Sequence, residues 1–133
     1  MDIHRIHPED IDEVWEFIEP LTSNNKMLNN WVTSNYLYNL LVNNKADLWV
    51  NMDLTAFCIG ATYSRIDNTK TYIVEYMTSD VSSSEGWNNT IKPIEEQAKE
   101  WGCSTIEVKG RKGWHRVLPE YKLKQITLEK QLC

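Results

Sequence analysis

The residues best suited to hold a phosphate-bearing ligand lie in two polar segments of the last third of the chain. The first, residues 79–86, reads Ser-Asp-Val-Ser-Ser-Ser-Glu-Gly and joins a strand-like run to an amphipathic helix. The free N–H groups at the start of a helix favour anions. The second, residues 110–118, reads Gly-Arg-Lys-Gly-Trp-His-Arg-Val-Leu and carries several cationic side chains. A loop before a helix and a basic corner after the next strand together predict a phosphate site.

Each segment also has an ordinary structural interpretation. The serines can form a polar loop in which Ser84 caps the following helix. In the basic segment, Gly110 and Gly113 can supply turn geometry and Trp114 can pack, while the charged side chains stay solvated. The residue types alone leave both interpretations open.

The net charge of −5 is divided unevenly along the chain. Residues 1–20 carry seven acidic side chains and one arginine, whereas residues 109–130 carry seven basic and two acidic side chains. Such a distribution favours a localised anion site or a charged partner, or two faces that complement each other within the fold. The acidic total disfavours general nucleic-acid binding.

Length and composition indicate one domain over residues 1–133. No apolar run approaches the roughly 20 residues that span a membrane, and the first residues lack a signal-peptide pattern. We therefore expect a cytoplasmic protein with no membrane partner. Cys58, Cys103 and Cys133 are widely spaced, so they predict neither a disulfide framework nor a zinc site.

The periodicity of apolar residues predicts the elements that would position these segments. A strand at 2–6 precedes two helices, one opened by Pro8 and ended by Pro20, the other starting at Thr33 or Ser34. Strands at 46–52, 55–64 and 71–78 form a meander, with a bulge expected at Gly60. A helix from about 89 to 101, in which Pro93 must lie near the start, then precedes a strand at 105–108, a short helix at 114–121 and a strand at 123–128.

The resulting order is β-α-α-β-β-β-α-β-α-β. It indicates an α/β (α+β) fold with a mixed, twisted sheet of about six strands and helices on both faces. The strands at 71–78 and 105–108 flank the main helix, so a right-handed crossover should make them parallel neighbours.

This order resembles the GNAT superfamily of N-acetyltransferases. The last part of the chain, residues 101–132, begins Trp-Gly, continues through Ile106-Glu-Val108 and the basic corner at 110–118, and closes on Thr-Leu-Glu-Lys-Gln-Leu at 127–132. It is similar to small GNAT-like proteins encoded by bacteriophages, in which a Gly-Arg-x-Gly-Trp-x-Arg-x-Leu corner precedes the last strand.

The resemblance implies acetyl-CoA as the acetyl donor, with its thioester between the strands at 71–78 and 105–108. An acceptor amine must lose a proton before it attacks, and the implied base is Glu75, with Tyr121 as the acid for the leaving thiolate. The alternatives are a strand carboxylate that faces solvent or pairs with a lysine, and a tyrosine that caps the core. The implied cofactor contacts are Met77, Ser82, Ser83, Ser84, Gly86, Arg111 and Arg116.

Departures from the superfamily pattern support other hypotheses. The superfamily loop reads Arg/Gln-x-x-Gly-x-Gly/Ala, whereas residues 82–87 contain one glycine, no Arg or Gln, and Trp87 where a small residue is expected. Leu118 stands at the position aligned with the superfamily's tyrosine. The chain can therefore be a non-catalytic phage protein that uses the fold for virion assembly or host-protein binding, or an inhibitor whose acidic first helix is a decoy.

The expected partner follows from the hypothesis. An active enzyme would take a small-molecule or protein amine, and a non-catalytic module would bind a phage or host protein within the infected bacterial cell or the virion. Superfamily members often dimerise, so the resemblance also implies a homodimer.

Overall fold

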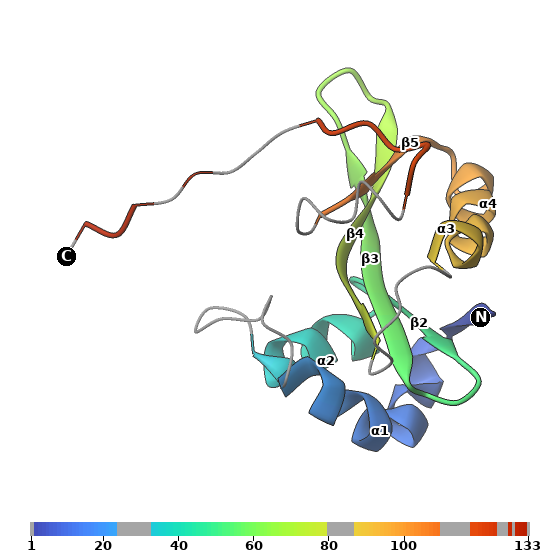
Figure 1. Cartoon of the computed structure of the whole chain (residues 1–133), viewed down its shortest axis with the longest axis vertical. Coiled ribbons are helices and arrows are strands. Elements are labelled where there is room, and N and C mark those ends of the chain that lie inside the picture. The colour runs from blue at the N-terminus through green and yellow to red at the C-terminus, as the bar shows by residue number, and fades with distance from the viewer. Residues whose placement is uncertain are drawn as a thin grey trace.

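The sheet at the centre of the fold is mixed, as the element order predicts (Figure 1). The computed structural model describes residues 2–23, 33–79, 87–109, 118–124, 128 and 130–132. In these residues five strands form one sheet in the order β1-β2-β3-β4-β5. Neighbours from β1 to β4 are antiparallel, and β4 and β5 are parallel, which confirms the crossover prediction. The strands are β1 (Ile3–Ile6), β2 (Asp47–Asn51), β3 (Ala56–Ser64), β4 (Lys70–Ser79) and β5 (Cys103–Val108).

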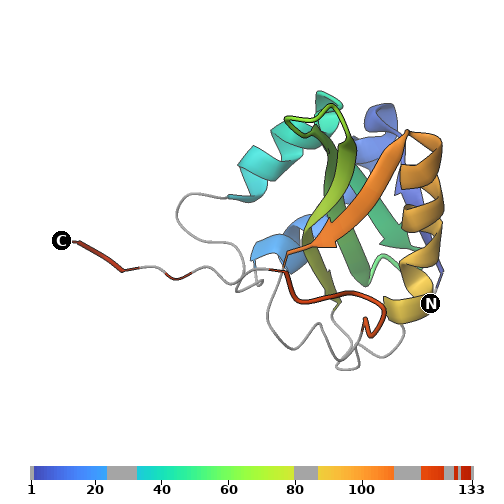
Figure 2. The ribbon, with the colours of Figure 1, turned by 90° about the horizontal axis from the view of Figure 1, so that it is seen from above.

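Helices cover both faces of this sheet (Figures 1 and 2). A 3₁₀ turn, η1 (Pro8–Asp10), leads into α1 (Ile11–Ser23), which packs with α2 (Ser34–Val42) over one face. The opposite face carries α3 (Trp87–Thr90) and α4 (Lys92–Glu100). No helix of the described chain has the length and apolar character needed to cross a membrane.

Helix α1 continues three residues beyond Pro20, so the prediction that Pro20 ends it is wrong. Proline removes one helical hydrogen bond, and here the loss falls in the last part of the helix. Burial of the following turn offsets it: Thr22 is buried, and its hydroxyl donates to the carbonyl oxygen of Glu19 at 2.6 Å. Leu21 packs against the core beside it.

The starts of the other helices follow local sequence signals. Thr33 is the N-cap of α2, and its hydroxyl accepts the backbone N–H of Tyr36 at 3.1 Å. The helix predicted near 89–101 is instead two helices separated at Ile91, and Pro93 lies in the first turn of α4, where a missing N–H costs least. Gly102 follows the C-cap with φ +86°, a backbone conformation that glycine adopts without strain at the end of a helix.

The sheet has five described strands where about six were expected. The predicted helix at 114–121 and strand at 123–128 lie partly outside the described residues. Their described parts are neither: Tyr121 N–H closes a turn onto the Leu118 carbonyl oxygen at 3.0 Å, and residues 122–124 and 128 are not in a strand. Pro119 disfavours a helix across the first of these segments. In the second, Leu123 and Leu128 are 52% and 91% exposed. Alternation of apolar and polar residues alone does not form a strand when no surface buries the apolar side chains.

A charge cluster at Glu107 links this last segment to β5. Lys124 Nζ lies 2.6 Å from Glu107 Oε1, and Arg65 Nη2 donates to the same oxygen at 3.0 Å. The hydrogen bond from Lys124 lowers the pKa of Glu107 below its ordinary value. A lowered folded-state pKa means stability that is present above the ordinary glutamate range and is lost as the pH falls through the folded value.

We expect Glu107→Gln to lower the free energy of unfolding by up to about 1 kcal/mol at neutral pH, because the Lys124 side chain is 64% exposed and the Arg65 side chain is partly exposed. The difference from the native protein should shrink as the pH falls through the lowered folded-state pKa of Glu107, because the carboxyl is then protonated in both states. Urea unfolding across this pH range measures it, with Glu96→Gln on α4 as an exposed control. A difference that stays constant with pH would contradict the assignment.

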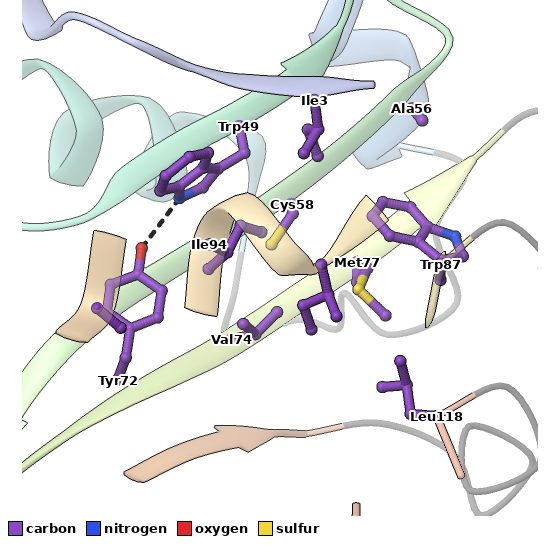
Figure 3. Packing of buried hydrophobic residues seen from close by; sticks show 12 residues of the cluster. Ile3, Trp49, Ala56, Cys58, Tyr72, Val74, Met77, Trp87, Ile94 and Leu118 are labelled. Atoms are coloured by element: carbon purple, nitrogen blue, oxygen red, sulfur yellow. Dashed lines mark hydrogen bonds between the residues drawn. The ribbon is translucent and has the colours of Figure 1, made fainter. Parts of the chain in front are cut away.

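A buried polar network ties three strands together. Trp49 Nε1 donates to the Tyr72 hydroxyl at 3.1 Å, and that hydroxyl donates to Asp47 Oδ2 at 2.9 Å (Figure 3). Arg5 Nε completes the chain by donating to Asp47 Oδ1 at 3.0 Å. Burial, with the charge of Asp47 as a smaller cause, raises the pKa of Tyr72, so the hydroxyl stays protonated.

The variant Tyr72→Phe should lower the free energy of unfolding by about 1–3 kcal/mol, because it leaves the buried Trp49 N–H without its acceptor. Denaturant unfolding measures this loss. Tyr63→Phe is the matched control, since the Tyr63 side chain is 45% exposed and water can replace its hydrogen bond. Equal stability of native protein and Tyr72→Phe would show that the network contributes nothing.

Candidate functional site

The described pairing between strands β4 and β5 ends at Val74 and Val108. Their parallel pairing runs from Lys70 and Cys103 to Val74 and Val108, and the Lys109 N–H extends it by one bond to the Val74 carbonyl oxygen at 2.9 Å. Strand β4 continues to Ser79, paired on its other side with β3. Residues 110–117, which continue the chain after Lys109, lie outside the described residues, and within the described chain no strand pairs with the β5 side of residues 75–79.

A β-bulge lies where the described pairing of β4 with β5 ends. Ile59 pairs with Tyr76 whereas Gly60 pairs with Val74, so Glu75 is the extra residue of the bulge. The sequence correctly indicated a bulge at Gly60, although the additional residue is on β4. Gly60 permits close packing here, because a Cβ atom would lie 2.6 Å from Cε2 of the Tyr72 ring. A β-bulge changes the direction in which side chains leave a strand. This bulge therefore sets the face of the sheet on which the Glu75 side chain lies.

The Glu75 carboxylate has partners on both neighbouring strands. The Tyr63 hydroxyl of β3 donates to Oε1 at 3.2 Å, and Lys109 Nζ, one residue past β5, lies 3.2 Å from Oε2. The side chain of Glu75 is 23% exposed, so a ligand can reach it. One alternative interpretation of Glu75 was a strand carboxylate that pairs with a lysine, and Lys109 is such a lysine. A partly exposed ion pair of this kind exchanges readily with solvent or a ligand.

Tyrosines surround this carboxylate. Partial burial, followed by the charge of Glu75, raises the pKa of both Tyr63 and Tyr76. Tyr36 of α2 contributes electrostatically to both and is therefore nearby; its side chain is 51% exposed. Because Tyr76 packs against the core under α1 and α2, the site opens on that face of the sheet. Protonated hydroxyls here can donate hydrogen bonds to a ligand.

Met77 and Trp87 belong to the core on the opposite face. Met77 is 2% exposed and Trp87 is 1% exposed, and Figure 3 shows them in the same cluster as Leu118. Only the backbone of Met77 is available for the predicted cofactor contact, which stays a prediction. The sequence suggested that the large side chain of Trp87 would obstruct a ligand where a small residue is expected. The indole packs inward, so its size is not an argument against ligand binding.

Tyr121 contacts helix α4. Its hydroxyl donates to Glu95 Oε2 at 2.6 Å, and burial, with this hydrogen bond second, raises its pKa. Its side chain packs against the cluster that holds Met77 and Trp87. Glu75 and Tyr121 therefore have separate partners, and the structure does not bring them together through any shared contact. A role for Tyr121 as an acid stays a prediction.

The remaining predicted cofactor contacts lie outside the described residues: Ser82, Ser83, Ser84, Gly86, Arg111 and Arg116. Sequence reasoning missed the two partners of Glu75, Tyr63 and Lys109. Lys109 follows directly after the strand at 105–108, and parallel pairing with the strand at 71–78 placed it near that strand's middle. The exact partner required the register, which periodicity does not provide.

Solved structures with a similar fold are acetyltransferases. A ribosomal-protein-alanine N-acetyltransferase from Brucella melitensis biovar Abortus 2308 has a TM-score of 0.69 at 14% identity, covering 99% of both chains. An aminoglycoside acetyltransferase from an uncultured soil metagenomic sample, in complex with sisomicin, has a TM-score of 0.69 at 13% identity, covering 99% of this chain and 96% of that one. An acetyltransferase from Clostridium acetobutylicum, with acetyl-CoA, has a TM-score of 0.65 at 16% identity, covering 99% and 95%.

No protein-family model and no curated protein matches the sequence. The likeness to solved structures therefore rests on the path of the chain over nearly its whole length. The chain has the fold of the GNAT N-acetyltransferases, which confirms the resemblance in element order.

Proposed function

We propose that the protein is a GNAT-type N-acetyltransferase that transfers the acetyl group of acetyl-CoA to an amine, with Glu75 as the base. One observation carries the proposal: the bulged residue Glu75 directly follows the last described pair of β4 and β5, and its carboxylate is accessible. The fold is one on which acetyltransferases are built, but fold alone does not give function, so the argument rests on this site.

Each described part of the site has a task in this reaction. Acetyl-CoA supplies an activated thioester. Residues 75–79 of β4, which pair with β3 on one side, would hydrogen-bond an extended amide-bearing ligand on the other, as a strand would. Glu75 binds the acceptor ammonium and takes up its proton, and the Tyr63 hydroxyl holds the carboxylate in place through Oε1.

The proposal extends to the segments that the structure does not describe. Backbone and hydroxyl groups of residues 82–86 would hold the pyrophosphate before α3, and Arg111 and Arg116 would contribute cationic contacts. The acceptor is a small-molecule or protein amine, and it enters from the face of α1 and α2, where Tyr36, Tyr63 and Tyr76 surround Glu75.

Calorimetric titration with acetyl-CoA tests the proposal. Binding at micromolar strength is the expected result, with acetate and ATP as control ligands that separate recognition of acetyl-CoA from general anion binding. Arg111→Ala combined with Arg116→Ala should weaken it, whereas Lys45→Ala, between α2 and β2, should leave it unchanged. Absence of binding at millimolar acetyl-CoA would overturn the proposal.

A second candidate is a non-catalytic module that binds a phage or host protein. The observation that favours it is the set of exposed leucines near the end of the chain: Leu123, Leu128 and Leu132 are 52%, 91% and 88% exposed. Exposed apolar side chains that recur along one segment suit a partner surface. Replacing all three with serine should abolish capture of the partner and leave acetyl-CoA binding intact, so the two candidates separate experimentally.

A further inference from the structure

We infer that the site around Glu75 takes an amine with one positive charge on an aromatic body, an arylalkylamine, in preference to a polyamine or an amino sugar. As an acceptor class, this ligand rests on the proposed acetyltransferase function. As a binding site, it rests on the described residues alone. It follows from three tyrosines, Tyr36, Tyr63 and Tyr76, and from the number of carboxylates near them.

Two of these tyrosines share one face of the sheet with Glu75. Ile59 and Ala61 of β3 belong to the core beneath α1 and α2, and side chains alternate along a strand, so Tyr63 lies on that face as well. Tyr76 of β4 packs against the same core. The Tyr63 hydroxyl donates to Glu75 Oε1 at 3.2 Å, which places the carboxylate on this face too.

The tyrosine rings leave surface for a ligand. Tyr36 of α2 is 51% exposed and Tyr63 is 45% exposed. Burial is the largest cause of the raised pKa of Tyr63 and of Tyr76, and Tyr36 contributes to both, which places it near them. Phenol rings stack on other aromatic rings at a low cost in conformational entropy, and their faces attract an ammonium group. An amine on an aromatic body therefore contacts the rings while its ammonium lies at Glu75.

The described surroundings of these rings hold a single carboxylate. After burial, the charge of Glu75 raises the pKa of Tyr63 and of Tyr76, and no other carboxylate of the described chain contributes to either. Lys109 Nζ, 3.2 Å from Glu75 Oε2, balances that one charge. One ammonium can replace Lys109 at Glu75, whereas the further ammonium groups of a polyamine would approach the rings with no carboxylate to pair with.

The segments that adjoin this site in the sequence supply little further negative charge. Residues 24–32, which lead to α2, and residues 110–117, which follow Lys109, contain no acidic residue. Asp80 and Glu85 come after β4, which carries the chain roughly 13 Å beyond its bulge before it ends at Ser79. The composition of these segments therefore favours a ligand with one ammonium group.

Lys109 is the group that an incoming amine displaces. Its side chain is 59% exposed, and an ion pair of such exposure gives way readily to a competing cation. The Glu75 carboxylate keeps its hydrogen bond from Tyr63 during the exchange, so it stays oriented. Aromatic contacts then add to the charge pairing, and we expect an arylalkylamine to bind about tenfold more tightly than an aliphatic amine of similar charge and size.

The test is a titration of the purified protein followed by NMR, with and without free CoA, in which 2-phenylethylamine is the probe. Its matched control is 2-cyclohexylethylamine, which has the same charge and nearly the same size but no aromatic ring. Spermidine and glucosamine represent polyamines and amino sugars. We expect 2-phenylethylamine to bind about tenfold more tightly than each of the other three. Equal affinity for any of them would overturn the inference.

Variants separate the ring contacts from the charge. Tyr36→Ala should lower the affinity for 2-phenylethylamine about threefold to tenfold and change that for glucosamine little. Glu75→Gln should weaken the binding of every amine, because it removes the one negative charge. Tyr38→Ala is the control on the same helix, since the Tyr38 ring packs on Trp15 and its hydroxyl donates to Asp12. An unchanged preference in Tyr36→Ala, or an equal loss in Tyr38→Ala, would contradict the assignment.

The inference and the proposed function can fail separately. Binding of 2-phenylethylamine that depends on Glu75, without any binding of acetyl-CoA, would overturn the proposed function and support the ligand class. Acetyl-CoA-dependent acetylation of spermidine or glucosamine in preference to 2-phenylethylamine would overturn the inference alone. Absence of binding of all four amines, with and without CoA, would also overturn it, and calorimetry with acetyl-CoA then decides the proposed function by itself.

Discussion

Glu75→Gln is expected to lower the rate of acetyl transfer to an external amine by about 100-fold, the usual contribution of a positioned general base. Glutamine has nearly the size of glutamate and its carbonyl oxygen can still accept the Tyr63 hydroxyl and Lys109, so the bulge should be preserved. Acetyl-CoA binding should therefore be unchanged. Steady-state kinetics with a saturating amine, beside calorimetry of the same variant, measures both quantities.

Tyr63→Phe is the matched control for this prediction. It removes one hydrogen bond to Glu75 Oε1 and leaves the carboxylate itself. Its loss of rate should be less than about tenfold, since water can replace this exposed hydrogen bond. Retention of full activity by Glu75→Gln would exclude Glu75 as the base.

Trp87→Ala is expected to lower the free energy of unfolding by about 3–5 kcal/mol, the range for truncating a buried aromatic side chain. Trp87 is 1% exposed and packs with Met77 and the residues of α4 under the sheet. The cavity would open at the start of α3. Equilibrium unfolding in guanidinium chloride measures the loss.

Trp87→Phe provides the comparison for that variant. Phenylalanine fills much of the cavity, so its loss should be clearly smaller than that of Trp87→Ala. If the indole served as an exposed interface anchor, both variants would leave the monomer's stability nearly unchanged and weaken a complex instead. A loss below about 1 kcal/mol for Trp87→Ala would contradict its placement in the core.

Features that depend on neighbours in the sequence could be predicted from the chain alone. Thr33 caps α2 because its hydroxyl reaches a backbone N–H three residues on, and Gly102 ends α4 because it tolerates a positive φ. The apolar spacing of Ile91, Ile94 and Ala98 identified the buried face of the main helix. The parallel pairing of β4 and β5 followed from a general rule of chain handedness.

Features that depend on packing could not be predicted in this way. Pro20 is a local signal for a helix end, but buried residues beyond it extend α1. Residues 123–128 alternate like a strand, yet the described leucines among them are exposed. Trp87 sits next to a polar loop in the sequence, whereas its indole lies in the core.

The sequence by itself determined the order of the elements from β1 to β5, and through it the GNAT fold, because caps, turns and periodicity act over a few residues. It also identified Glu75 as the residue to consider. Only the tertiary structure decided which groups Glu75 meets, because the register of three strands places Tyr63 from β3 and Lys109 from the end of β5 against one bulge. Contacts between residues 12 and 34 positions apart are set by packing, which no local pattern encodes.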